Sequence, residues 1–276
     1  MNDVTVVTGG TGVLGSAVVR RLLMDERPVR VLSRRPRPEG DRLPVEWAVG
    51  DLKSGEGLDA AVDGAAAIVH CATTGGRADA RLTRTLVAAA GRTGRPHLVH
   101  VSVVGADRVP DSFHRAKLAA EEAVTGSGLP WSVLRTTRFH DRIARSARSR
   151  PWLPVVLTLA GDVPLQPVEP REVAERLAAL AAGEPTGAVE EMGGPQIRTA
   201  SELTRAALRA QGRHRPVVAL RWPGRTSGRL RDGGLLTAEH ADGRATLEDH
   251  LARGEPPGVV TMVEPAGGRT EHPSRS

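Results

Sequence analysis

The chain has 276 residues, 39% hydrophobic and 25% charged, a composition that excludes general disorder and leaves room for one large α/β domain with a small lobe. Its net charge of +6 comes mostly from arginine, and aromatic residues make up only 2%, too few for the stacking surface of a nucleic-acid-binding protein. No apolar run is long enough to cross a bilayer and the N-terminal segment lacks the pattern of a secretory signal, so we expect a cytoplasmic protein without a membrane partner. The single cysteine, Cys71, excludes an internal disulfide and a zinc framework, and we expect no metal.

The first predicted strand contains Val4, Val6 and Val7, and a glycine-rich stretch, residues 8–15, follows it directly. Residues 13–24 then show the apolar spacing of a helix. Glycine lets the backbone turn tightly and lets an anion approach the N–H groups at the start of that helix. A structural turn would explain one glycine but not three at intervals of three, a variant of the dinucleotide fingerprint. The stretch therefore predicts a diphosphate site formed by Gly9, Thr11, Gly12, Val13, Leu14 and Gly15.

The second predicted strand, residues 28–33, ends where the adenosine ribose of a bound dinucleotide would lie. An acidic residue there would accept a hydrogen bond from the 2′-hydroxyl of NAD, whereas arginine pairs with the 2′-phosphate of NADP. Arg34 and Arg35 follow this strand and predict NADP. The alternative is a solvated basic loop in an arginine-rich chain.

Two further predicted strands, residues 45–49 and 65–71, each end in candidate cofactor contacts. Asp51 and Leu52 follow the first and would contact the adenine, although Asp51 could instead cap a short helix near Ser54. Ala72 and the small residues after it follow the second strand and leave room for a cofactor. A helix over 78–90 and a strand over 97–103 continue the alternation, which predicts a Rossmann-type, doubly wound parallel sheet.

The strand over 97–103 carries Ser102 near its end, and the next helix begins at Asp111 or Ser112. A strand over 131–136 leads into a segment rich in arginine that extends to Arg150. If this segment is one helix, four arginines form a rough face, either solvated or attracting an anionic substrate or the cofactor phosphates. These are Arg138, Arg142, Arg145 and Arg148.

Beyond residue 150 the pattern changes to shorter pieces. We predict a strand over 163–168, helices over 172–182 and 201–211, and further helices near Leu230 and Leu247. Residues 1–150 are thus expected to be the dinucleotide-binding core, and 151–253 a substrate-capping lobe interleaved with it. Residues 254–276, rich in Pro, Gly, Ser and charge, predict a disordered tail.

Taken together, five motifs resemble the atypical short-chain dehydrogenase/reductase superfamily, in particular its NmrA-like NAD(P)-binding group. They are residues 8–15, 50–52, 101–107, 115–121 and 134–141, and the likeness spans about residues 3–253. The resemblance implies a Tyr-x-x-x-Lys pair on the helix after the fifth strand, in which lysine holds the nicotinamide ribose and tyrosine protonates the substrate oxygen. Lys117 matches the lysine, but Phe113 stands where the tyrosine is expected.

Without that tyrosine, the candidate proton donors are only neighbours in sequence of the expected site: Ser102, His114, Thr137 and His140. We take Lys117, Ser102 and His140 as the catalytic candidates. The resulting expectation is an NADP-dependent oxidoreductase acting on a small carbonyl, enone or quinone-like acceptor. The alternative is a non-catalytic NADP-binding sensor that regulates a protein partner, and a sugar or isoprenoid-modifying epimerase is a third reading. The oligomeric state stays open.

Overall fold

The computed structural model describes residues 4–148, 155–159, 161–220 and 223–254. Within them, seven parallel strands form one sheet in the order β3-β2-β1-β4-β5-β6-β9. The strands are β1 (Val4–Thr8), β2 (Val29–Ser33), β3 (Glu46–Val49), β4 (Ala65–His70), β5 (His97–Val103), β6 (Trp131–Thr136) and β9 (Val189–Met192). The strand order reverses between β1 and β4, which is where a doubly wound sheet binds its ligand. This confirms the predicted Rossmann-type fold.

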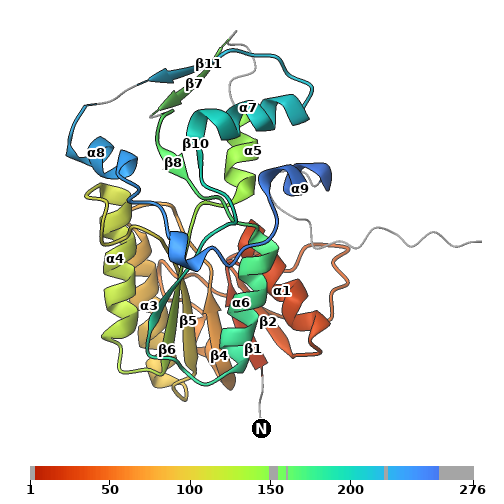
Figure 1. Cartoon of the computed structure of the whole chain (residues 1–276). Helices are drawn as coiled ribbons and strands as arrows, with labels where there is room; N and C mark the ends of the chain where they lie inside the picture. The colour runs from red at the N-terminus through yellow and green to blue at the C-terminus, as the bar shows by residue number, and fades with distance from the viewer. Residues whose placement is uncertain (1–3, 149–154, 160, 221–222, 255–276) are drawn as a thin grey trace, which may run out of the picture.

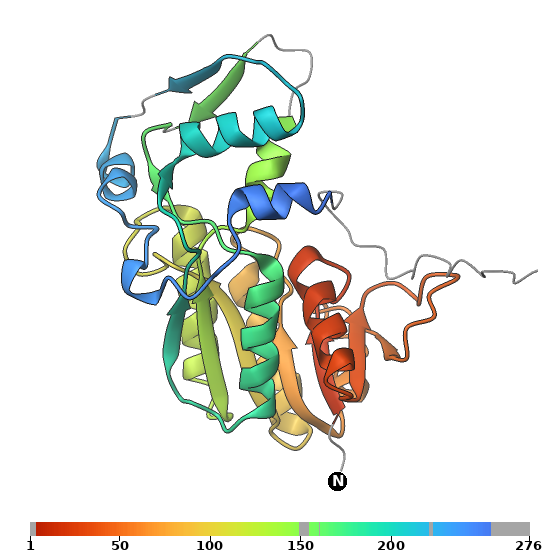
Figure 2. The same cartoon turned by 45° about the vertical axis from the view of Figure 1, so that its right-hand side comes forward.

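Helices cover both faces of the sheet (Figures 1 and 2). On one face lie α1 (Val13–Met24) and α6 (Pro170–Ala182), packed on each other and on the central strands through the first apolar cluster. On the other lie α2 (Leu58–Val62), α3 (Asp79–Arg92) and α4 (Ser112–Thr125), around the second cluster. Because both faces are covered, the central strands are buried without alternation, as β1 shows with five buried residues, Thr5 and Thr8 among them.

Three expectations about the core are corrected. Helix α6 was assigned to the capping lobe, but it packs against the sheet, and β9 was not predicted, although it pairs with β6. The short helix expected near Ser54 begins only at Leu58, so Asp51 does not cap it; its carboxylate accepts from the backbone N–H of Lys53 at 2.8 Å instead.

The remaining elements form the lobe, which stands over the carboxyl ends of the core strands (Figure 1). It contains α5 (His140–Arg148), β7 (Val156–Leu159), β8 (Pro164–Leu165), β10 (Arg198–Thr199), α7 (Ala200–Ala210), β11 (Val217–Leu220), α8 (Arg225–Arg231), the 3-10 turn Ala238–His240 and α9 (Leu247–Ala252). Helices α5, α7 and α9 meet in a third apolar cluster. The predicted strand over 163–168 shrinks to β8, and β7 and β11 were not predicted.

Local sequence explains where the lobe helices start. Thr199 and Glu202 form a capping box on α7, and Thr246 and Asp249 form another on α9. Arg138 precedes α5, so it does not share a helix with the other arginines of its segment.

The described helices include none that is both long and apolar enough to cross a membrane. The predicted tail lies outside the described residues apart from Gly254.

Candidate cofactor and active site

The glycine loop joins β1 to α1 at the point where the strand order reverses. Gly9 has a φ of +68° there, and a Cβ on it would stand 2.8 Å from the backbone nitrogen of Ala72. A Cβ on Gly15 would stand 2.1 Å from the carbonyl oxygen of Gly9. Gly12 donates its N–H to that same oxygen at 2.9 Å, which closes the loop. Gly9 and Gly15 are therefore needed for this compact turn, whereas Gly12 has a φ of −84° and a Cβ on it would stand 3.2 Å from the same oxygen.

The start of α1 keeps its backbone donors available. Gly12 caps the helix without any side-chain hydrogen bond. Thr11 and Gly12 are exposed, whereas Leu14 is buried in the apolar core, so Leu14 would serve a diphosphate only through its backbone N–H. Free N–H groups and the positive end of the helix dipole favour an anion at this position.

Arg34 and Arg35 lie directly after β2, and both side chains are exposed. The backbone here is fixed, because the Arg35 N–H donates to the Ser33 hydroxyl and the Arg35 carbonyl accepts from the Trp47 indole at 2.9 Å. Neither guanidinium is paired with a carboxylate among the described residues. Two unpaired guanidinium groups on an anchored loop match the requirement of a 2′-phosphate.

Lys117 is buried and held by α3 and the loop before it. Its Nζ lies 2.8 Å from a carboxylate oxygen of Asp79 and donates to the Thr73 hydroxyl at 2.9 Å. Asp79 also accepts hydrogen bonds from the Thr74 backbone N–H and from the hydroxyls of Thr73 and Thr74. Burial raises the pKa of the Asp79 carboxyl, but the charge and hydrogen bond of Lys117 and the threonine hydrogen bonds outweigh burial and lower this pKa to about 2. The Asp79 carboxyl is therefore ionised at neutral pH.

Asp79 was missed by sequence reasoning. An acidic residue in the first turn of a predicted helix is normally explained by the helix dipole, so nothing distinguished it. The lysine has three N–H donors, and Asp79 and Thr73 use two of them. One donor is left for a ribose hydroxyl.

Phe113 lies on the same face of α4 as Lys117, with its ring centre 5.9 Å from Nζ. This confirms that the two positions lie together as the i, i+4 spacing predicts. Phenylalanine offers no proton.

Two histidines lie buried behind the lysine. His70 bonds through Nδ1 to the Thr8 hydroxyl at 2.7 Å and through Nε2 to the Thr83 hydroxyl at 3.1 Å. The His100 ring stacks at 5.2 Å from that of His70 and has no hydrogen-bond partner among the described residues. Burial, and then the Lys117 charge, lowers the pKa of His70 to about 4, and burial also holds the pKa of His100 well below its usual range. Both rings are neutral at pH 7, so they do not compete with Lys117 for Asp79.

Ser102 and Thr137 lie at the carboxyl ends of the neighbouring strands β5 and β6. Both hydroxyls are buried, and neither has a hydrogen-bond partner in the described structure. A buried hydroxyl without a partner is costly, so these two groups are polar atoms that the described structure leaves unsatisfied.

His140, expected as a proton donor, has a different place. Its Nε2 faces the carbonyl of Ala245 at 3.1 Å, which can only accept, so the ring proton is engaged there and ties the lobe segment before α9 to α5. Burial lowers the pKa of His140 to about 4, so the ring is neutral and its Nδ1 carries no proton. The structure thus gives His140 a structural role. His114 is likewise occupied, bonded to its helix cap Asp111.

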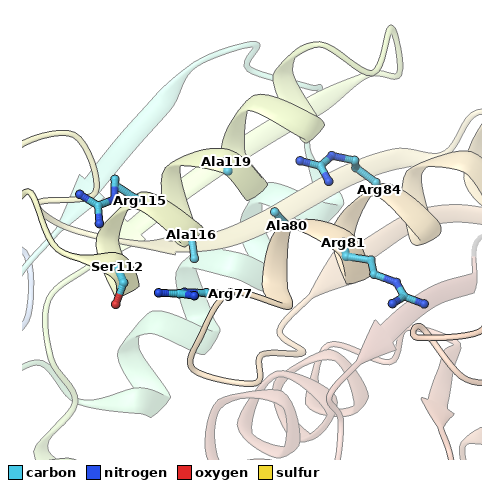
Figure 3. A pocket seen from close by; sticks show the side chains of 8 residues that line it. All are labelled: Arg77, Ala80, Arg81, Arg84, Ser112, Arg115, Ala116 and Ala119. Carbon is cyan, nitrogen blue, oxygen red and sulfur yellow. The ribbon is translucent and has the colours of Figure 1, made fainter.

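A surface groove of about 430 Å³ lies between α3 and α4 (Figure 3). Four arginines and an alanine stripe line it: Arg77, Arg81, Arg84, Arg115, Ala80, Ala116 and Ala119, together with Ser112. It contains none of the glycine-loop, lysine or hydroxyl groups described above, so the cofactor is not placed there.

Residues at four strand ends fit a dinucleotide. The glycine turn leaves no room for a Cβ, the donors of α1 are free, the arginines after β2 are unpaired, and Ser102 and Thr137 lack partners. Asp51 is half-buried, Leu52 is buried and half-buried Ala72 touches the Gly9 turn, which places them along the same edge of the sheet.

Comparison with known proteins identifies the family of the chain. Residues 9–153 match the NAD(P)H-binding family. A reductase of (4-alkanoyl-5-oxo-2,5-dihydrofuran-3-yl)methyl phosphate from Streptomyces griseus is 34% identical over an alignment of 215 residues, and the match covers 75% of this chain and 73% of that protein.

Two solved structures share the fold. The NADPH complex of a quinone oxidoreductase from Escherichia coli has a TM-score of 0.76 at 19% identity, covering 90% of this chain and 99% of that one. A Citrobacter triphenylmethane reductase complexed with NADP(H) has a TM-score of 0.71 at 18% identity, covering 91% and 99%. The chain therefore belongs to the NAD(P)H-binding family, as an atypical short-chain dehydrogenase/reductase of the NAD(P)H-dependent reductase type.

Proposed function

We propose that the protein is an NADPH-dependent reductase of an electron-poor carbon–carbon double bond conjugated with carbonyl groups. The observation that carries this proposal is Phe113, which stands beside Lys117 where a carbonyl reductase of this type would carry its acid. Reduction of an isolated ketone yields an alkoxide and needs a nearby acid. Hydride addition to the β-carbon of a doubly activated alkene instead moves the electron pair into an enolate shared by two oxygens, and water supplies the proton to the α-carbon.

The named substrate of the Streptomyces griseus relative has this chemistry. A 4-alkanoyl-5-oxo-2,5-dihydrofuran contains a ring double bond conjugated with a ring carbonyl and an alkanoyl carbonyl. For this chain we infer an acceptor of the same electronic type, the enone member of the carbonyl, enone and quinone-like classes that the sequence suggests.

Each group of candidate residues would bind a different part of the cofactor or the acceptor. The glycine loop would hold the diphosphate, Arg34 and Arg35 the 2′-phosphate, and the free donor of Lys117 the nicotinamide ribose. NADPH supplies the hydride when bound. The unpartnered hydroxyls of Ser102 and Thr137 would donate to the acceptor carbonyl and stabilise the enolate oxygen.

A matched pair of substrates tests the proposal. An acyl butenolide should oxidise NADPH, whereas the same compound with its ring double bond already saturated should not. With 4-deuterated NADPH, the label should appear on the β-carbon. Reduction of the saturated compound at its ketone by the native protein would contradict the proposal.

Phe113→Tyr provides the complementary test. The introduced phenol would stand beside Lys117 and supply the absent acid, so we expect ketone reduction of the saturated compound to appear or rise at least tenfold, measured as NADPH consumption. If the rate stays at background, the missing hydroxyl is not what restricts the acceptor.

The second candidate is a non-catalytic NADP-binding regulator of a protein partner. It is favoured by Lys117 being committed to Asp79 in the absence of any acid at position 113. Measurable NADPH binding without turnover of butenolides, quinones or aldehydes would select it.

A further inference from the structure

We propose that the acceptor carries a phosphate group and that Arg138 and Arg142 bind it. This inference rests on the proposed function, because it names the substrate class of the same site. The proposed ligand of the two arginines is a phosphate on the acceptor. The phosphates of the cofactor are the alternative ligand.

The backbone around both arginines is fixed at the carboxyl edge of the sheet. Thr137, next to Arg138, donates its N–H to the Met192 carbonyl at 3.0 Å, and the Arg138 carbonyl accepts from the Val168 N–H at 3.0 Å. Arg142 lies in the first turn of α5 and donates its N–H to the Phe139 carbonyl at 3.1 Å. The backbone at both arginines is therefore anchored, and Arg138 directly follows Thr137, whose hydroxyl has no hydrogen-bond partner among the described residues.

Neither guanidinium is neutralised. Both side chains are exposed, and within the described residues neither has an ion pair or hydrogen bond. Arg135, three residues earlier in β6, shows the contrast: it is bonded to Glu121 at 2.7 Å and to Asp107 at 2.8 Å. The protein surrounding Arg138 and then the charge of Arg142 lower the pKa of Arg138. An anion between the two groups would relieve this repulsion.

Position along the sheet separates the acceptor from the cofactor phosphates. Strand β6 lies three strands from β1 and four from β2. At about 4.8 Å per strand, Arg138 is roughly 14 Å from the glycine loop and roughly 19 Å from the end of β2. The diphosphate and 2′-phosphate are expected at β1 and β2. An anion at β6 would thus belong to the acceptor, on the side of Ser102 and Thr137.

The test compares an acyl butenolide methyl phosphate with the corresponding free alcohol. Each is titrated calorimetrically into protein saturated with NADP, where no turnover occurs, and each is assayed for kcat/KM with NADPH. We expect the phosphate ester to be preferred tenfold to a hundredfold. Arg138→Gln and Arg142→Gln should each reduce the ester-to-alcohol ratio about tenfold, because each removes charge-assisted hydrogen bonds. Arg138→Lys should retain part of the ratio.

Arg84→Gln is the matched control, because it removes one exposed arginine from the α3/α4 groove and should leave the ratio unchanged. Equal binding of ester and alcohol by the native protein, or an unchanged ratio in both variants, would overturn the proposal. So would a loss of NADP affinity that accounts for the whole effect, since the arginines would then hold the cofactor. If the ester binds in an arginine-dependent way but NADPH is not oxidised, the phosphate site is supported and the reductase activity is rejected. If ester and alcohol are turned over equally, the reductase activity is supported and the phosphate site is rejected.

Discussion

Lys117 illustrates how a single residue depends on partners that are distant in sequence. It is buried, and a buried ammonium is tolerated only when paired and hydrogen-bonded. Asp79 and Thr73 meet this requirement at 2.8 Å and 2.9 Å. These two contacts orient the remaining N–H donor of Lys117, so Asp79 acts as a positioning residue for the lysine.

Replacing Asp79 with Asn should therefore leave an uncompensated buried charge. We expect the free energy of unfolding to fall by about 3 kcal/mol, measured by urea denaturation at pH 7. The double variant Asp79→Asn with Lys117→Met should recover part of this loss. Equal stability of the native protein and Asp79→Asn would show that the ion pair contributes nothing to folding.

Arg34 and Arg35 determine a different property, the choice of dinucleotide. Replacing both with Ala should weaken NADP binding about tenfold to a hundredfold, with NAD binding changed less than about twofold, because only NADP carries the 2′-phosphate. Calorimetric titration with both cofactors measures this, and Arg84→Ala controls for the loss of surface charge. A preference for NAD in the native protein would refute the assignment.

At the scale of elements, the contact between the glycine loop and α1 decides whether the diphosphate site forms. Gly15 lies inside α1, where alanine is intrinsically better by up to about 1 kcal/mol. The Cβ would stand 2.1 Å from the Gly9 carbonyl oxygen, a backbone atom that cannot move away without opening the loop. The steric term therefore exceeds the helix propensity.

Gly15→Ala should lower the free energy of unfolding by about 1–3 kcal/mol and weaken NADP binding at least tenfold. Gly91→Ala in α3 is the control, since no atom lies within 4 Å of its added Cβ. It should be neutral or stabilise the protein by about 0.5–1 kcal/mol without affecting NADP. For both variants, thermal unfolding measures stability and calorimetric titration measures NADP binding. Similar effects of the two substitutions would exclude the steric explanation.

The whole molecule should be acid-sensitive because it buries neutral histidines. The pKa values of His70 and His140 are lowered from 6.5 to about 4. Below pH 6.5 the unfolded chain binds protons at these rings and the folded chain does not, so their stabilising contribution is complete above pH 6.5 and is lost as the pH falls toward 4. Each ring accounts for up to about 1.4 kcal/mol per pH unit in this window.

Urea denaturation at pH 8, 7, 6 and 5 measures this loss. His140→Gln retains an N–H donor for Ala245 but does not titrate, so its stability should decline less steeply between pH 6.5 and 5, by about 1 kcal/mol per pH unit. Identical slopes for the native protein and this variant would show that His140 does not keep its lowered pKa.

Local patterns in the sequence are sufficient to predict the dinucleotide-binding half of the fold. Runs of valine, glycine spacing and helical periodicity act over a few residues, so β1, α1 and the positions of Phe113 and Lys117 on one face followed from local rules. Long-range contacts, by contrast, establish that α6 and β9 complete the core, that Asp79 holds Lys117, and that the His140 ring is bonded to Ala245 of the lobe. These features arise from contacts between residues far apart in the chain, and their packing and desolvation leave no periodic signal in the sequence.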